Sequence, residues 1–138
     1  MFDDRLEKIN EECGVFGIFA PGRSVSELIY LGLFSLQHRG QEGCGIAVSE
    51  GKAINHYKNL GMVTDVFNQS TLDSLNGYLG IGHVRYSTSG QSKTQQNTQP
   101  IVARFQHGQI ALAHNGSLTN AAELRNHSMH HFYNRIPE

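Results

Sequence analysis

Apolar residues in this sequence occur in short runs that end at glycine- or proline-containing turns. This pattern predicts that the strands of the fold are short. The first run follows Cys13 and stops at Pro21-Gly22, which is typical of a strand that leads into a turn. Two later runs flank Glu50-Gly51-Lys52 and predict a hairpin. The predicted strands cover residues 14–19, 45–49, 53–58, 79–84, 101–105 and 109–114.

Helices are predicted between these strands. Ser24 and Glu27 have the spacing of a capping box, and apolar residues follow at helical intervals, so a helix is expected over residues 24–37. Asn120 and Glu123 repeat the capping pattern and predict a second long helix. A short helix is expected over residues 62–67.

Length and charge narrow the class of protein. The 138 residues suit one compact domain or part of a larger one. A net charge of -1 with interspersed signs provides no basic face for nucleic acid, and no apolar stretch is long enough to span a bilayer. Two cysteines, Cys13 and Cys44, make no disulfide framework, and no secretory signal is present. We therefore expect a cytoplasmic protein whose partner is a small molecule or another protein.

Three places where loops meet strands carry candidate chemistry. Cys13 stands at the start of the first strand, directly after a charged leader over residues 1–12. Arg85 follows a strand, and so does the pair Asn115-Gly116, which offers a carboxamide donor beside a backbone N–H, the two kinds of group that an oxyanion hole uses. Together these residues suggest acyl chemistry.

Each candidate also has a structural explanation when it is taken alone. Cys13 could pack in the core, Arg85 could form a surface ion pair, and Asn115-Gly116 could be a simple turn. Cys44 is interpreted as a core residue. The histidines His127, His130 and His131 could suggest a metal site, but no cysteine or carboxylate accompanies them at ligand spacing.

Four segments in combination resemble the N-terminal glutaminase domain of glutamine phosphoribosylpyrophosphate amidotransferases, or amidophosphoribosyltransferases, which are class II glutamine amidotransferases. The segments are Cys-Gly-Val-Phe-Gly-Ile from Cys13, Leu-Gln-His-Arg-Gly-Gln-Glu-Gly from Leu36, Gly-His-Val-Arg-Tyr-Ser-Thr-Ser-Gly from Gly82, and Ala-His-Asn-Gly-Ser-Leu-Thr-Asn from Ala113. The resemblance implies an α+β fold of the N-terminal-nucleophile hydrolase type, an αββα sandwich of which only part is present.

The resemblance also implies roles for individual residues. Residues 1–12 would be a propeptide whose removal frees the α-amine of Cys13, the nucleophile. Asn115 and Gly116 would stabilise the oxyanion, and Arg85 would bind the α-carboxylate of glutamine. The remaining expected pocket residues are Thr88, Arg39 and Gly40, the last two on a loop against the nucleophile.

The end of the chain departs from the family pattern. Residues 13–125 are assigned to a partial glutamine amidotransferase domain, and residues 126–138 to a non-matching tail that lacks the aspartate expected to bind the α-ammonium group. A phosphoribosyltransferase domain for phosphoribosyl pyrophosphate is not found either. Magnesium and an iron–sulfur cluster are implied for the full-length family member, which is homo-oligomeric, and no cofactor is expected in this chain. The alternatives are a truncated or frameshifted fragment without catalysis and a small histidine-rich metal-binding protein.

Overall fold

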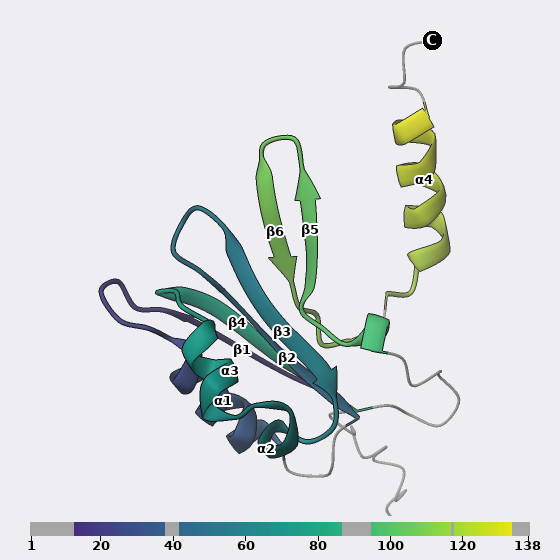
Figure 1. The fold of residues 1–138 in the computed structure, drawn as a ribbon. Coiled ribbons are helices and arrows are strands. Elements are labelled where there is room, and N and C mark those ends of the chain that lie inside the picture. Colours follow the sequence, from purple (N-terminus) through teal and green to yellow (C-terminus); the bar gives the residue numbers. More distant parts are fainter. Residues whose placement is uncertain (1–12, 38–41, 87–94, 117, 134–138) are drawn as a thin grey trace, which may run out of the picture.

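A computed structural model describes residues 13–37, 42–86, 95–116 and 118–133 (Figure 1). Its centre is a four-stranded antiparallel sheet in the order β1-β4-β2-β3. The strands are β1 (Cys13–Phe19), β2 (Gly43–Ser49), β3 (Ile54–Leu60) and β4 (Leu79–Arg85). β5 (Ile101–Phe105) and β6 (Gly108–Leu112) form a separate hairpin.

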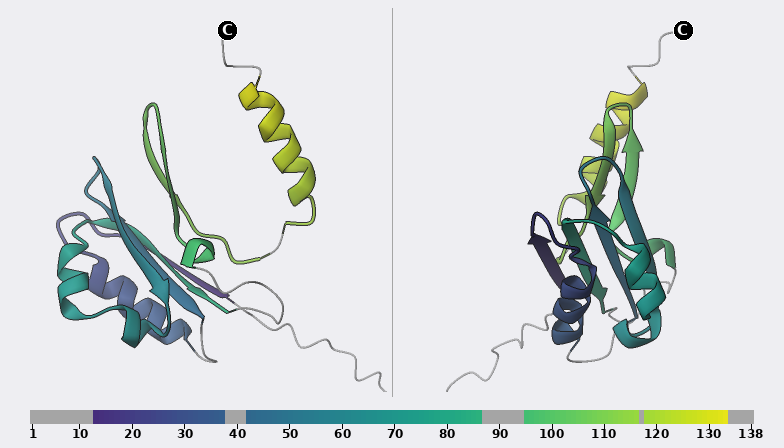
Figure 2. Two further views of the ribbon diagram at one scale, coloured as in Figure 1. Left: turned by 45° about the vertical axis from the view of Figure 1, so that its right-hand side comes forward. Right: turned by 60° about the vertical axis from the view of Figure 1, so that its left-hand side comes forward.

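Helices cover one face of the four-stranded sheet, and the β5–β6 hairpin stands on the other side (Figure 2). The covering helices are α1 (Ser26–Leu36), α2 (Val63–Val66) and α3 (Gln69–Ser74). A short 3-10 turn, η1 (Gln95–Asn97), precedes the hairpin, and α4 (Ala121–Tyr133) stands beyond it. No helix within the described residues is long and apolar enough to cross a membrane.

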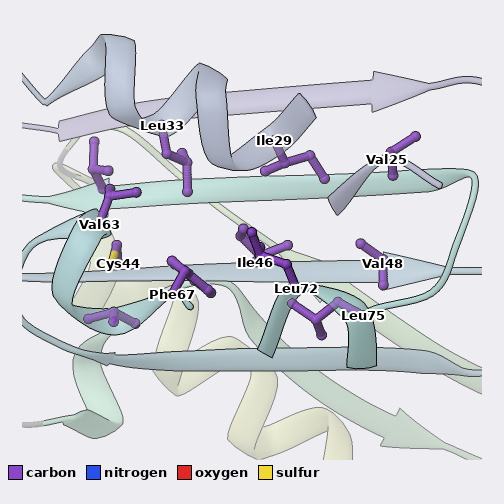
Figure 3. Close-up of a cluster of buried hydrophobic side chains, with 12 residues drawn as sticks. Val25, Ile29, Leu33, Cys44, Ile46, Val48, Val63, Phe67, Leu72 and Leu75 are labelled. Atoms are coloured by element: carbon purple, nitrogen blue, oxygen red, sulfur yellow. The ribbon is translucent and has the colours of Figure 1, made fainter. Parts of the chain in front are cut away.

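The hydrophobic core lies between the sheet and α1–α3. Ile29 and Leu33 of α1 point toward the strands and are fully buried (Figure 3). Ile46 of β2 contributes from the sheet, and Phe67 closes the core beside α2. Burial of such side chains stabilises the folded state by about 1.5–3 kcal/mol each, so this layer is the main source of stability.

Glycines on β4 allow α1 to lie close to the sheet. A Cβ atom added to Gly82 would stand 2.5 Å from a methyl carbon of Ile29 and 2.9 Å from one of Leu33. One added to Gly80 would stand 2.6 Å from Ile29. The absence of side chains at these positions therefore sets the distance between helix and sheet.

The predicted strands are all present, with ends that agree to within two residues. The last strand ends at Leu112 rather than at residue 114, because the backbone N–H of His114 donates to the side chain of Gln99 instead of to a strand. The helix predicted over residues 24–37 is present as α1, but the prediction that Ser24 caps this helix is wrong. Val25 occupies the cap position, is fully buried, and donates its N–H to the carbonyl of Gly77.

The sequence analysis missed α3. Its cap is Asn68, whose side chain accepts a hydrogen bond from the N–H of Thr71 at 2.9 Å. Asparagine at this position is a recognised helix start, but the helix is short and buries only Leu72, so its apolar periodicity is weak.

The close approach of α1 to β4 generates a stability prediction. Gly82→Ala should lower the free energy of unfolding by about 1–3 kcal/mol, because the added methyl group overpacks the contact with Ile29. The control is Gly17→Ala on β1, where the nearest atom to an added Cβ lies at 3.8 Å, and a change within about 0.5 kcal/mol is expected. Urea unfolding of both variants measures the difference, and equal stability would contradict the packing argument.

Candidate active site

The register of three neighbouring strands brings the predicted nucleophile and the predicted carboxylate-binding residue together. Cys13 of β1 pairs directly with Arg85 of β4, and Arg85 pairs on its other side with Gly43 of β2. Directly opposed residues of antiparallel strands have Cβ atoms about 4.5–5.5 Å apart and share one face. Cys13 is half-buried, with Sγ 3.8 Å from the carbonyl oxygen of Tyr86, and Arg85 is 9% exposed.

Asn115 also reaches Cys13, although the two residues are 102 positions apart in sequence. Its Nδ2 donates a hydrogen bond to the carbonyl oxygen of Cys13 at 2.9 Å. A carboxamide nitrogen carries two hydrogens, so the second N–H can bind another acceptor. Three of the predicted site residues therefore gather at one end of the sheet.

Gly116 follows with φ +144, a backbone conformation that residues with a side chain rarely adopt. A Cβ atom placed there would also stand 3.2 Å from Nε2 of His114. Only glycine fits this position without strain, which leaves its backbone N–H uncovered by a side chain beside Asn115. The pair has the two donors expected of an oxyanion hole.

The sequence analysis missed His83, which lies two residues before Arg85 on the same face of β4. The side chain is fully buried, and neither ring nitrogen meets a described partner at hydrogen-bonding geometry. Burial lowers the pKa of His83 to about 4; the backbone of His114 opposes part of this shift, and the charge of Arg85 adds to it. The alternation of side chains along a strand could have placed His83 beside Arg85, but not its burial.

Three predicted pocket residues, Arg39, Gly40 and Thr88, lie outside the described residues. The interpretation of Cys44 as a core residue is confirmed. It is fully buried, and this burial, with a smaller effect of Asp65, raises the pKa of its thiol to about 12.

The described residues do not fit a metal centre. Within these ranges, no three histidine, cysteine or acidic side chains lie close enough together to hold an ion. Iron–sulfur clusters need several cysteine thiolates, and Cys13 and Cys44 lie on opposite faces of the sheet. His127 is exposed on α4.

Comparison with known proteins decides the family. The sequence profile described as glutamine amidotransferases class-II matches residues 26–134. This chain belongs to the class-II glutamine amidotransferases. Amidophosphoribosyltransferase of Methanocaldococcus jannaschii is 60% identical over 114 residues, which are 82% of this chain and 24% of that protein. The Mycobacterium leprae amidophosphoribosyltransferase is 51% identical over 115 residues, which are 83% of this chain and 20% of that protein.

Solved structures give the same family fold. Glutamine phosphoribosylpyrophosphate amidotransferase from B. subtilis, complexed with ADP and GMP, matches with a TM-score of 0.74 at 39% identity, over 90% of this chain and 26% of the other. A structure described as the allosteric regulatory enzyme of purine biosynthesis matches with a TM-score of 0.76 at 40% identity, with the same coverage. The predicted α+β, N-terminal-nucleophile hydrolase fold is confirmed, and the chain spans about a quarter of these amidotransferases.

The buried state of His83 generates a pH prediction. Its pKa is about 4 in the folded chain and 6.5 in its unperturbed state, so the unfolded chain takes up a proton first as the pH falls. The contribution of His83 to stability is present above about pH 6.5 and is lost between there and about pH 4, at up to about 1.4 kcal/mol per pH unit.

Urea unfolding between about pH 7 and about pH 5 tests this linkage. His83→Gln should show a shallower decline in stability than the parent chain. His56→Gln, which removes an exposed histidine of β3, should follow the parent. Equal slopes for all three chains would contradict a buried, neutral His83.

Proposed function

We propose that this chain is the glutaminase part of an amidophosphoribosyltransferase, which releases ammonia from the side chain of glutamine. In the complete enzyme, ammonia would react with phosphoribosyl pyrophosphate to give phosphoribosylamine and pyrophosphate, the first step of purine nucleotide synthesis. The observation that carries the proposal is the 2.9 Å hydrogen bond from Asn115 to Cys13, with Arg85 directly opposite Cys13 in the sheet.

The proposed reaction begins when the thiol of Cys13 passes its proton to its own α-amine, which is a base near neutral pH once residues 1–12 are removed. Sγ then bonds to the amide carbon of glutamine. The carbon–nitrogen bond breaks as the α-ammonium returns the proton to the leaving group, which departs as ammonia. Water hydrolyses the γ-glutamyl thioester to glutamate and restores the thiol.

Asn115 and Gly116 would stabilise the oxyanion of both tetrahedral intermediates. One N–H of the Asn115 carboxamide is bound to the Cys13 carbonyl. Among the described residues, neither the other N–H nor the backbone N–H of Gly116 has an acceptor. Loss of one such donor typically lowers the rate about 100- to 1,000-fold.

Arg85 would bind the α-carboxylate of glutamine. Its guanidinium group is permanently charged, and its planar fork can donate two parallel hydrogen bonds to a carboxylate. The position of Arg85 opposite Cys13 supports this role, because glutamine must place its carboxylate near one residue and its amide near the other. Thr88, Arg39 and Gly40 are proposed to line the same pocket.

The proposal also covers the processing, location and assembly of the protein. Residues 1–12 act as a propeptide, because an amide nitrogen at Cys13 cannot accept the thiol proton. The protein is cytoplasmic and homo-oligomeric, and phosphoribosyl pyrophosphate and magnesium are bound by a separate domain. The competing function is that of a fragment without catalysis.

The propeptide assignment predicts the mass of the purified chain. After expression in a bacterial cytoplasm, the intact mass should correspond to a chain that starts at Cys13. Cys13→Ala should retain residues 2–12 if the cysteine takes part in its own processing. A parent chain that keeps residues 2–12 would leave the α-amine blocked and would favour the non-catalytic fragment.

The site assignment predicts separate effects on turnover and binding. In a chain that starts at Cys13, Cys13→Ala should abolish ammonia release, because no nucleophile remains. Arg85→Lys should raise KM for glutamine by about tenfold or more, because lysine cannot form the bidentate pair. The matched thiol control, Cys44→Ala, should retain turnover at a temperature where it is folded. Full activity of Cys13→Ala would refute the nucleophile, and an unchanged KM in Arg85→Lys would refute the carboxylate site.

A further inference from the structure

We propose that Gln99 is a positioning residue for the oxyanion hole, holding the segment of Asn115 and Gly116 beside the nucleophile. Oε1 of Gln99 accepts a hydrogen bond of 2.6 Å from the backbone N–H of His114. His114 directly precedes Asn115, and the bond lies just past the end of β6. The inference rests on the proposed function, because it concerns the same reaction centre.

The backbone of Gln99 is held close to β2 by the shape of the strand. A Cβ atom on Gly45 would collide with the carbonyl oxygen of Gln99 and stand 3.0 Å from Cδ of Pro100. A Cβ atom on Gly43 would stand 2.9 Å from Oγ1 of Thr98. The lack of side chains at these two glycines therefore allows residues 98–100 to lie close against β2.

Lys58 of the neighbouring strand β3 fixes the same segment from the side. Its Nζ donates to the carbonyl oxygen of Thr98 at 2.6 Å and to that of Pro100 at 3.3 Å. These bonds flank Gln99 on both sides in sequence. Burial lowers the pKa of Lys58, a sign that the amine is drawn from solvent toward these carbonyl groups. The backbone that carries the Gln99 side chain is thus held in place by Lys58 and by contact with β2.

Two hydrogen bonds therefore hold residues 114–116, the segment that carries the proposed oxyanion-hole residues (the oxyanion segment). Gln99 holds the N–H of His114, and the side chain of Asn115 donates to the carbonyl oxygen of Cys13. Directly after Asn115, the backbone turns into the positive-φ conformation of Gly116. An oxyanion hole accelerates the reaction only if its donors are already in place when charge develops. Loss of the Gln99 bond should therefore reduce turnover and leave glutamine binding, which depends on Arg85, nearly unchanged.

Gln109 provides a matched control. Its Oε1 also accepts a backbone hydrogen bond, from Ile54 at 2.9 Å. Ile54 pairs with Ser49, at the opposite end of the sheet from Cys13. Gln109 joins β6 to β3, whereas Gln99 joins the two chain segments that flank the hairpin, and only Gln99 adjoins Asn115 and Gly116 in space through its bond to His114. A purely structural role would make the two substitutions equivalent.

The experiment compares Gln99→Leu, Gln99→Glu and Gln109→Leu in chains that start at Cys13. Gln99→Leu should lower kcat about 10- to 100-fold with KM for glutamine within about twofold of the parent. Gln99→Glu keeps an oxygen acceptor and should recover most of the loss. Gln109→Leu should keep the parent kcat. Equal kcat losses in the two leucine variants, or no loss in Gln99→Leu, would overturn the proposal.

Hydrogen exchange of the 138-residue chain separates this inference from the proposed function. The backbone amide of His114, which loses its acceptor, should exchange about tenfold faster in Gln99→Leu than in the parent, and at the parent rate in Gln109→Leu. If Gln99→Leu aggregates, Gln99→Asn, which is one methylene shorter and places its acceptor out of reach, is measured instead. Absence of ammonia from the parent chain would count against the proposed function alone. An unchanged exchange rate at His114 would overturn the positioning role whatever the activity.

Discussion

The antiparallel register that aligns Cys13, Arg85 and Gly43 across β1, β4 and β2 is the constraint on which the site depends. Side chains alternate between faces along a strand, so a shift of one residue in β1 would turn the thiol toward the core and Gly14 toward the site. The buried side chains opposite α1 oppose such a shift, because it would expose them. Packing on one face of the sheet therefore fixes the positions of the proposed site residues on the other face.

The two faces use their glycines for different purposes. Gly80 and Gly82 allow α1 to pack closely on the core side, and Gly43 and Gly45 allow residues 98–100 to approach β2 on the other side. A sheet with side chains at these positions would hold both layers farther away. Residues 98–100, which include the proposed positioning residue Gln99, would then lie farther from β2.

The sequence predicted the strands well because their apolar runs are short and end at turns, and it predicted Cys13, Arg85, Asn115 and Gly116 because they occur in specific motifs. That the described residues of this set share one end of the sheet agrees with the roles proposed for them. The capping box at Ser24 failed because burial of Val25 and its bond to Gly77 outweigh the local capping signal. Gln99 could not be predicted, since its role depends on a bond to His114 across the fold.

The electrostatics of the site follow from the burial of His83 beside Arg85. A second positive charge on the buried ring would be costly, both because it loses hydration and because Arg85 lies near. The imidazole therefore stays neutral at the pH where the α-amine of Cys13 can act as a base. Arg85 is 9% exposed, and limited access to water would strengthen its attraction for the carboxylate that it is proposed to bind. A neutral His83 thus adds no second positive charge beside Arg85, the residue proposed to bind the α-carboxylate of glutamine.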